Sequence, residues 1–428
     1  MDAEIRAVSA GDLTVQHVVQ RYPLEPGLWV TLTPEAGAWR CSIDDERVGA
    51  GDGEPAYGAD ALTHLLRFQH VPPVDRFQLV RHMPSPEASG ERPVDDDGQT
   101  VVVGERVVVA RVRLLRDVPY TAPITLAQLA EVDFLGVPDT HGLLIWTTPG
   151  GHEAPVAVVT RYLPRAVDGR QALMRLLTRG VTAEPAETPT LTARMGRIAA
   201  ALHVALATRT SVLAEPVRPG TAAELQGWHR RVRATVQRAA LVAAEGTVTG
   251  SAHHLGSGQH FLARLGQLEA DAEGLAALAG SRSEVPFQRV HGDLHAARIL
   301  RWAGGLAVTG FGDEPEGDPA FLAPQPAARD LARLLQSFDR IAADVDEQAG
   351  TNAATTEWLP GARRRLISAY RTELSVANRP ELFDERLLAA FEAEHTARQV
   401  LEAAHRQAAA RALDALDRSA MPRWEQHR

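Results

Sequence analysis

The spacing of apolar residues divides the chain into a β-rich first part and a helical second part. Apolar and polar residues alternate over positions 27–45 on both sides of a Pro-Glu-Ala-Gly turn, which predicts a β-hairpin. Two β-branched runs within positions 100–115 flank a Gly-Glu pair and predict a second hairpin. A helical pattern follows over 126–137, and two more strands follow over 143–164. This order predicts a small antiparallel sheet with one helix packed on it.

From residue 169 onward the pattern becomes helical. Apolar residues recur at positions i, i+3, i+4 and i+7, and Ala and Leu replace Val and Ile. One β-like segment over 287–311 interrupts the helices, which resume at residue 327 and continue toward the C-terminus. Polar residues stand at the turns of this segment, and loops held on rigid elements are where chemistry tends to occur. The segment is therefore the first place to look for a functional site.

The positions from 84 to 98 are rich in Pro, Glu, Asp and Gly, which indicates a linker or a long acidic loop. We therefore predict an α+β protein of three parts, which is consistent with a length of 428 residues. These parts are a β-rich N-terminal domain over 1–90, a sheet lobe with one helix over 91–168, and a helical lobe over 169–428 that carries a hairpin at 287–315.

The basic residues of the chain are all arginine, 45 in number. The absence of lysine excludes a P-loop, a Schiff-base lysine and a lysine general base. Mutational bias in a GC-rich genome is one sufficient cause of this composition. Arginine nevertheless cannot lose its proton and act as a base, so the chemistry available to the chain is restricted.

Charge and cysteine content exclude further classes. A formal net charge of −9 argues against broad nucleic-acid binding, which favours basic surfaces. The single cysteine, Cys41, excludes a disulfide framework and a cysteine-rich zinc site. The sequence has neither a basic segment followed by an apolar run at its start nor an apolar stretch of about 20 residues. We therefore expect no signal peptide, no membrane contact and a cytoplasmic location.

The candidate chemistry lies in the run from Gln288 to Leu300, where Asp293 follows a glycine and is flanked by His291 and His295. An aspartate within hydrogen-bond reach of a substrate hydroxyl can accept its proton during phosphoryl transfer. Two other interpretations remain open. The His and Asp side chains could hold a turn by hydrogen bonds to the backbone. They could also be metal ligands, although the downstream Gly-Asn-His of a phosphoesterase-like site is missing.

This run resembles the catalytic loop of the aminoglycoside-phosphotransferase-like superfamily, and more specifically that of actinobacterial maltokinases and glucosamine kinases. The resemblance covers roughly residues 100–405 and rests on motifs in the family's order. The matching residues are Gln288 to His295 in the catalytic loop, Met195-Gly196-Arg197 and Leu202-His203 in a helix, Val158, Val159, Tyr162, Pro164, Asp168 and Gly169 in the hinge, and Arg329-Asp330 and Ser337-Phe338-Asp339 in a later helix. The resemblance implies a bilobal protein-kinase-like fold with an N-terminal β-rich cap.

The resemblance also implies roles for individual residues. Asp293 matches the catalytic base, and Gln288, His291 and His295 would support its loop. Asp330 would hydrogen-bond that loop from below. In the nucleotide site the backbone of Thr160, Arg161 and Tyr162 would meet the adenine, with Asp168 close by.

The chain departs from the family where phosphate charge is handled. A metal-binding Gln or Asn five positions after Asp293 is replaced by Arg298, which cannot ligate a cation. The family's metal-binding Asp, which precedes a Phe that matches Phe311, is replaced by Gly310. The strand lysine that fixes phosphates is replaced by Ala110 in one alignment, or by Arg111 after a one-residue slip that changes the face of the strand.

By resemblance, an active protein would use ATP and Mg²⁺, whereas an inactive one could use no cofactor. Asp313 or Glu314 could serve as a substitute magnesium ligand, or Arg298 could neutralise phosphate without metal. The acceptor would be a hexose, an amino sugar or a disaccharide. In the last helix Glu392, Glu394 and His395 match the residues that line the acceptor pocket, although a solvated acidic face would give the same pattern.

Two hypotheses follow. The first is an ATP-dependent sugar kinase with Asp293 as the base, and the retained aspartate favours it. The second is a pseudokinase that binds a sugar, a nucleotide or a protein partner, and Ala110, Arg298 and Gly310 favour it.

Overall fold

The computed structural model describes residues 20–25, 28–35, 37–45, 59–67, 76–94, 99–112, 114–179, 187–245, 258–281, 284–311 and 322–420. Contacts between Cα atoms divide the chain into two compact units. Unit 1 takes its residues from 1–167, 208–216 and 299–323, and unit 2 from 168–207, 217–298 and 324–428. Both helices and several sheets occur, as the apolar pattern predicts.

Unit 1 contains a four-stranded antiparallel sheet in the order β1-β2-β3-β8. Its strands are β1 (Gln20–Glu25), β2 (Leu28–Glu35), β3 (Ala38–Asp45) and β8 (Leu114–Arg116). The β2–β3 pair confirms the first predicted hairpin, and Gly37 at its turn has a φ of 83°, which favours glycine. Strand β8 comes from the end of the region predicted as the second hairpin, yet it pairs with β3.

The second sheet of unit 1 has six strands in the order β4-β9-β10-β7-β6-β5. They are β4 (Phe77–Arg81), β5 (Glu91–Pro93), β6 (Thr100–Val103), β7 (Val107–Arg111), β9 (Thr140–Thr147) and β10 (Glu153–Arg161). The β6–β7 hairpin is confirmed, with positive φ at both Gly104 and Glu105 as a type I′ turn requires. The predicted pair over 143–164 corresponds to β9 and β10.

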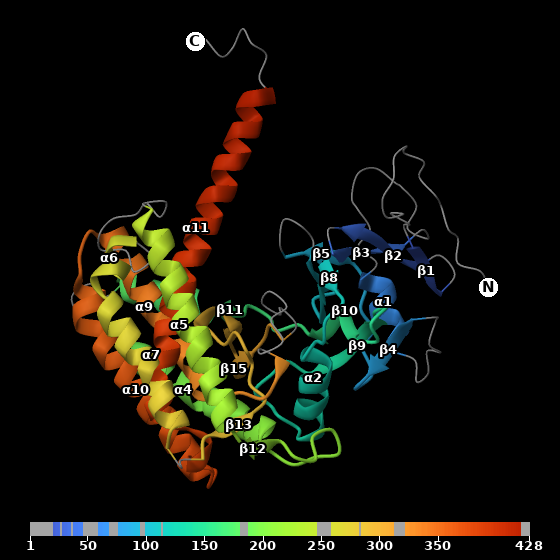
Figure 1. The fold of residues 1–428 in the computed structure, drawn as a ribbon. Coiled ribbons are helices and arrows are strands. Elements are labelled where there is room, and N and C mark those ends of the chain that lie inside the picture. Colours follow the sequence, from blue (N-terminus) through green and yellow to red (C-terminus); the bar gives the residue numbers. More distant parts are fainter. Residues whose placement is uncertain are drawn as a thin grey trace. The chain divides into compact units, whose positions relative to one another are not determined.

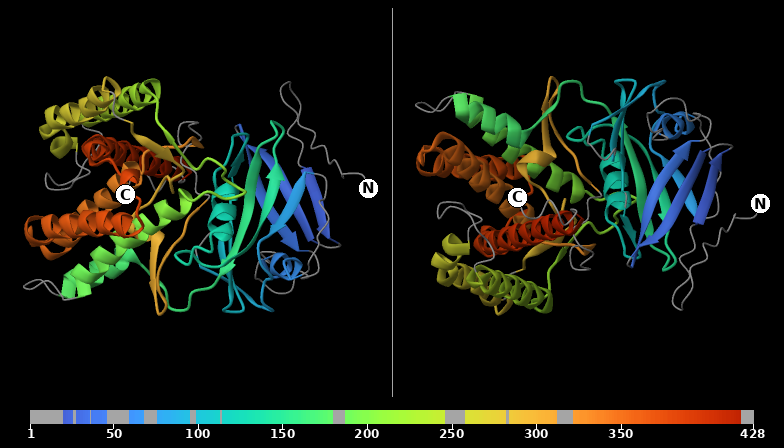
Figure 2. Two further views of the ribbon diagram at one scale, coloured as in Figure 1. Left: turned by 90° about the horizontal axis from the view of Figure 1, so that it is seen from below. Right: turned by 90° about the horizontal axis from the view of Figure 1, so that it is seen from above.

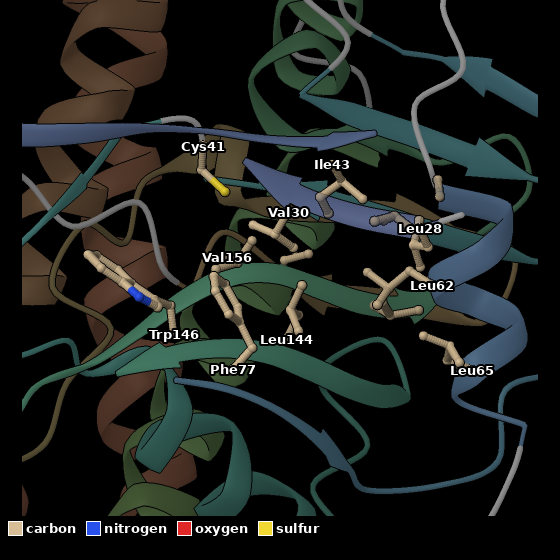
Figure 3. Close-up of a cluster of buried hydrophobic side chains, with 14 of the residues drawn as sticks. Leu28, Val30, Cys41, Ile43, Leu62, Leu65, Phe77, Leu144, Trp146 and Val156 are labelled. Atoms are coloured by element: carbon tan, nitrogen blue, oxygen red, sulfur yellow. The ribbon is translucent and has the colours of Figure 1, made fainter. Parts of the chain in front are cut away.

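The two sheets pack face to face and share one hydrophobic core (Figure 2). Leu28 and Val30 of β2 contribute side chains to this core, and so do Leu144 and Trp146 of β9 (Figure 3). Helix α1 (Ala59–Leu65) covers one end of it. Residues on both sides of position 90 therefore contribute to the same core, whereas the composition of positions 84–98 predicts a domain boundary there.

The opposite face of the six-stranded sheet carries helix α2 (Ala122–Glu131), which lies slightly earlier in the chain than the predicted helix over 126–137. Leu126 of this helix packs against Leu143, Ile145 and Val158 of the sheet, together with Phe311. The sheet thus has two different faces, one toward the four-stranded sheet and one toward α2. Unit 1 also holds the hairpin of β14 (Ile299–Trp302) and β15 (Gly305–Val308).

Unit 2 is built mainly from helices (Figure 1). Its long helices are α3 (Gly169–Arg179), α4 (Glu187–Leu206), α5 (Ala222–Ala244), α7 (Leu265–Ala279), α9 (Ala328–Ala349), α10 (Leu359–Val376) and α11 (Leu388–Ala420). Shorter helical segments are α6 (Gly258–Ala263), η1 (Ala296–Arg298), η2 (Ala354–Trp358), η3 (Pro380–Leu382) and η4 (Glu385–Leu387). The remaining short strands are β11 (Val167–Asp168), β12 (Val217–Pro219) and β13 (Pro286–Gln288).

Local sequence signals explain where several of these helices begin and pack. Thr221 and Glu224 form a capping box that starts α5, each side chain accepting a hydrogen bond from the other's backbone N–H. A Cβ atom at Gly196 would lie 2.4 Å from the carbonyl oxygen of Leu366, so glycine allows α4 and α10 to approach closely. Within the described part of the chain, no helix is long and apolar enough to cross a membrane.

Candidate active site

The loop that carries Asp293 is fixed by Asp330 in the first turn of α9. The Asp330 carboxylate accepts hydrogen bonds from the backbone N–H groups of His291 at 2.7 Å and Gly292 at 2.9 Å. Gly292 has a φ of 91°, which suits glycine and turns the chain just before the aspartate. This is the contact that the resemblance implies for Asp330.

A buried chain of polar groups supports Asp330 from the helices behind it. His203 of α4 places Nε2 3.1 Å from Asp330 and Nδ1 2.6 Å from the hydroxyl of Tyr370 in α10. Burial would raise the pKa of Asp330, but the hydrogen bonds from His203 and His291 lower it, so the carboxylate is ionised. An ionised acceptor at this distance requires a proton on Nε2 of His203, so His203 donates to Asp330.

Arg329 holds the other side of the same loop. Its guanidinium donates to the carbonyl oxygen of Gly292 at 3.4 Å and to the side chain of Gln325 at 3.1 Å. Glu394 of α11 pairs with it at 3.1 Å, and neither side chain is more than 3% exposed. Arg398 also donates to Glu394 at 3.0 Å. Because the buried charges are paired and hydrogen-bonded, α11 holds Arg329 of α9 in place against the carbonyl of Gly292.

The Asp293 carboxylate itself is surrounded by basic side chains. Arg333 of α9 donates from Nε to Oδ1 at 2.8 Å, and Nε2 of His295 lies 3.4 Å from Oδ2. Nη2 of Arg298 lies 3.7 Å from the same Oδ2. Burial would raise the pKa of Asp293, but His295 and Arg333 outweigh burial and hold that pKa well below its usual range. The carboxylate is therefore a permanent anion at neutral pH.

Arg333 is a residue of this site that the sequence motifs did not indicate. Its Nη1 donates to Gln336 at 2.8 Å, and Gln336 in turn donates to Gln399 of α11 at 2.6 Å. The signal was present in the helical spacing, because residues at i, i+3 and i+4 share one face. Arg333 follows Asp330 by three positions and Arg329 by four, so the three side chains lie on one face of α9.

The residues expected at an acceptor pocket make internal contacts instead. Glu394 has no exposed side-chain surface and holds Arg329. His395 is 4% exposed, and its Nε2 lies 3.2 Å from the carbonyl oxygen of Arg329. Glu392 forms a two-pronged ion pair with Arg363, both distances being 2.7 Å. The buried Glu394 and His395 are thus neither a solvated acidic face nor an open pocket wall.

Gln288 supports the loop through its backbone. It forms a two-way bridge with Gln325, with N–H···O distances of 3.0 and 2.7 Å. Its side chain is 1% exposed. This bridge ties the strand that leads into the loop to the segment before α9.

In unit 1 the pleat of β7 separates the two alternatives for the strand lysine. Ala110 pairs with Val158, whose side chain packs with Phe311 on the α2 face of the sheet. Arg111 pairs with Ala157, which belongs to the core shared with the four-stranded sheet. Paired residues of an antiparallel ladder point to the same face. Ala110 therefore shares a face with Phe311, and Arg111 lies on the opposite face.

The expected nucleotide residues lie at the end of β10 and the start of α3. The backbone N–H groups of Arg161 and Tyr162 donate to Asp139 and Arg106, both at 2.8 Å. Thr160 pairs with neighbouring strands inside the sheet. In unit 2, Asp168 accepts from the backbone N–H of Gln171 at 2.9 Å, as a residue that caps a helix does.

The described side chains around Asp293 do not fit a divalent cation. Arg298 has no acceptor atom, and Arg333 already donates to Asp293. In unit 1, Gly310 has no side chain to offer a cation. In the described part of the chain, no group of three or more His, Cys, Asp or Glu side chains could hold a metal ion. Asp313 and Glu314, the two expected substitute ligands, lie outside the described residues.

Comparison with known proteins gives one consistent result. No protein-family model matches the chain. A glucosamine kinase of Mycolicibacterium smegmatis is 32% identical over 382 residues, which is 86% of either chain. A glucosamine kinase of Streptacidiphilus jiangxiensis is 32% identical over 390 residues, covering 85% of this chain and 82% of that protein.

Solved structures agree with the sequence comparison. A glucosamine kinase structure aligns with a TM-score of 0.70 and 26% identity over 93% of both chains. A second, a glucosamine kinase in complex with glucosamine, ADP and inorganic phosphate, aligns with a TM-score of 0.70 and 27% identity over 90% of both chains. With this identity over most of its length and this shared fold, the chain belongs to the glucosamine kinase family.

Proposed function

We propose that this protein transfers the γ-phosphoryl group of ATP to a hydroxyl of a small sugar, with an amino sugar of the glucosamine class as the first candidate. The observation that carries the proposal is the Asp293 carboxylate on its anchored loop, in a chain that belongs to the glucosamine kinase family. A relative whose structure holds glucosamine and ADP supports both the donor and the acceptor class. The bilobal kinase-like fold with a β-rich cap, and a cytoplasmic location, are part of the same proposal.

In the proposed reaction the hydroxyl oxygen of the sugar attacks the γ-phosphorus and the bond to the bridging oxygen of ADP breaks. Asp293 accepts the hydroxyl proton as the new P–O bond forms. Its lowered pKa keeps it ionised and therefore ready to accept at neutral pH. Asp330 and Arg329 hold the loop on either side of Gly292, so the carboxylate is positioned before substrate binds.

A magnesium ion would supply charge neutralisation on the phosphates in a phosphotransferase, but the side chains that the structure describes around Asp293 do not fit one. We therefore assign no step to a metal. Thr160, Arg161, Tyr162 and Asp168 remain proposals for nucleotide binding, and their main-chain and capping hydrogen bonds give them a structural role as well.

The alternative is a pseudokinase, a member of this family that binds a sugar, nucleotide or protein partner without turnover. Ala110 favours it, because this residue shares the face of Phe311 but has no charge to offer phosphate. Arg298 and Gly310 favour it as well, since neither can ligate a cation. The retained and anchored Asp293 favours the kinase.

An assay of ADP release over a sugar panel tests the proposal. The panel contains glucosamine, N-acetylglucosamine, glucose and maltose, and a no-sugar control measures hydrolysis. We expect ADP release that depends on glucosamine and falls for N-acetylglucosamine, whose nitrogen carries no charge. ADP release equal to the no-sugar control for every sugar, in protein that melts at a higher temperature with ATP, would instead support the pseudokinase.

A further inference from the structure

We propose that Arg298 and Arg333 form an anion site on the catalytic loop and bind phosphate oxygens in place of a divalent cation. The inference rests on the proposed function for the identity of the physiological anion, a nucleotide phosphate. Anion binding by these two arginines does not require turnover, because it depends only on the charges that surround Asp293.

The two arginines approach the carboxylate from its two oxygens. Arg333 donates from Nε to Oδ1 at 2.8 Å, and Arg298 places Nη2 3.7 Å from Oδ2. A carboxylate that already holds two guanidinium groups has a weakened attraction for a metal cation. The pair plus Asp293 carries a net charge of about +1, which favours an anion near the loop.

Both guanidinium groups are partly accessible to a ligand. A guanidinium has five N–H groups, and the hydrogen bonds of Arg333 to described residues use Nε for Asp293 and Nη1 for Gln336. The side chains of Arg333 and Arg298 are 21% and 25% exposed, so part of each guanidinium reaches solvent. The planar fork of an arginine matches the oxygens of a phosphate.

The geometry is set in advance on both sides. Gln336 fixes Arg333, and Gln399 of α11 fixes Gln336 through a 2.6 Å hydrogen bond. The backbone of Arg298 is held in the η1 turn, where its N–H donates to the carbonyl of His295 at 2.8 Å, and its guanidinium lies 3.7 Å from Asp293. Because the hydrogen bonds of Arg333 to Asp293 and Gln336 restrict its side chain, this arginine loses little freedom when a phosphate binds.

Calorimetric titration of the full-length protein with ADP, and separately with inorganic phosphate, tests the site. Each titration is run in EDTA and again in excess Mg²⁺. We expect binding of both anions in EDTA, with an affinity that Mg²⁺ changes less than about threefold. Arg298→Gln and Arg333→Gln should each weaken binding at least tenfold, while Arg238→Gln, an exposed arginine of α5, should leave it unchanged.

Several results would overturn the proposal. These are binding that disappears in EDTA, no binding of either anion under both conditions, or equal affinity in Arg238→Gln and the two site variants. Circular dichroism melting of each variant shows that a loss of affinity is not a loss of fold. Failure of the sugar panel with retained phosphate binding would reject the kinase activity and leave this site standing.

Discussion

Nε of Arg333 donates a 2.8 Å hydrogen bond to Oδ1 of Asp293, which joins helix α9 to the loop that carries this aspartate. The same carboxylate lies 3.4 Å from His295 and 3.7 Å from Arg298. Asp293 is thereby both ionised and shielded. Asp293 can accept a proton from a substrate hydroxyl only where these three basic groups leave one of its oxygens accessible. Their positions once a nucleotide phosphate is bound therefore decide whether Asp293 can act as a base.

Arg333→Gln should move the acid limb of kcat/KM to a higher pH. Removing an arginine in contact with a carboxylate raises its pKa, by about 1–3 pH units for an aspartate beside an arginine. Wild-type Asp293 has a lowered pKa and stays ionised at acid pH, whereas the variant begins to protonate earlier. The pH profile of sugar phosphorylation measures this difference.

The same ion pair contributes to folding stability with a defined pH dependence. Because the pKa of Asp293 is lowered in the fold, its contribution is present above the unfolded pKa of about 3.9 and is lost as pH falls below it. The stability gap between wild type and Arg333→Gln should therefore be larger at pH 7 than at pH 3. For the pH profile of kcat/KM, an acid limb at the same pH in wild type, in Arg333→Gln and in the control Arg238→Gln would contradict the assignment of that limb to Asp293.

Asp330→Asn should destabilise the fold and disorder the loop. The Asp330 carboxylate accepts from two backbone N–H groups and from His203 while 1% exposed, and the amide would turn an NH₂ group toward one of these donors. We expect a loss of roughly 2–4 kcal/mol in the free energy of unfolding, measured in urea. Asp344→Asn on the same helix, which breaks a more exposed pair with Arg170, should cost under about 1 kcal/mol.

Glu394→Gln distinguishes a support for the loop from a wall of an acceptor pocket. The substitution leaves the buried Arg329 without its charged partner, so we expect the free energy of unfolding to fall by about 3–5 kcal/mol. We also expect a lower kcat, because Arg329 holds the carbonyl of Gly292 next to Asp293. Glu402→Gln, an exposed change on the same helix, should stay within about 0.5 kcal/mol of wild type. A large rise in KM for the sugar without any change in melting would place Glu394 in the acceptor pocket instead.

Leu28→Ala and Leu144→Ala test whether the two sheets of unit 1 unfold together. Both side chains are at most 1% exposed in the same core, so each cavity should cost about 2–5 kcal/mol. Calorimetry should show a single unfolding transition for the two sheets, and both variants should lower its midpoint temperature. Separate transitions, each shifted by only one of the variants, would indicate an independent N-terminal domain ending near residue 90.

The sequence predicts the hairpins and helices well because each depends on local spacing. The alternation around Gly37 and the β-branched runs around Gly104 correspond to the β2–β3 and β6–β7 pairs. What local spacing does not show is which surfaces meet. Strand β8 pairs with β3 across about 75 positions of chain, and the apolar core that joins the two sheets depends on that packing.

The candidate site likewise contains residues that short motifs indicate and residues that only the packing of the fold brings together. The resemblance identifies Asp293 and the Asp330 that holds its loop, because both belong to short motifs. Arg333 was missed because its contact with Asp293 spans 40 positions and depends on the packing of α9 against the loop. Glu394 was expected at an acceptor pocket, whereas its burial against Arg329 follows from the packing of α11, which spacing alone does not report.

The most direct test of the account is mass-spectrometric measurement of phosphorylated glucosamine made from ATP by wild-type protein and by Asp293→Asn. A positioned general base contributes about 10²–10⁴-fold to rate, and the substitution keeps the shape of the side chain. We predict a glucosamine phosphate product in wild type that falls by at least about a hundredfold in the variant, with both proteins folded. Equal product from the two proteins, or none from wild type, would contradict the assignment of Asp293 as the base of a sugar kinase.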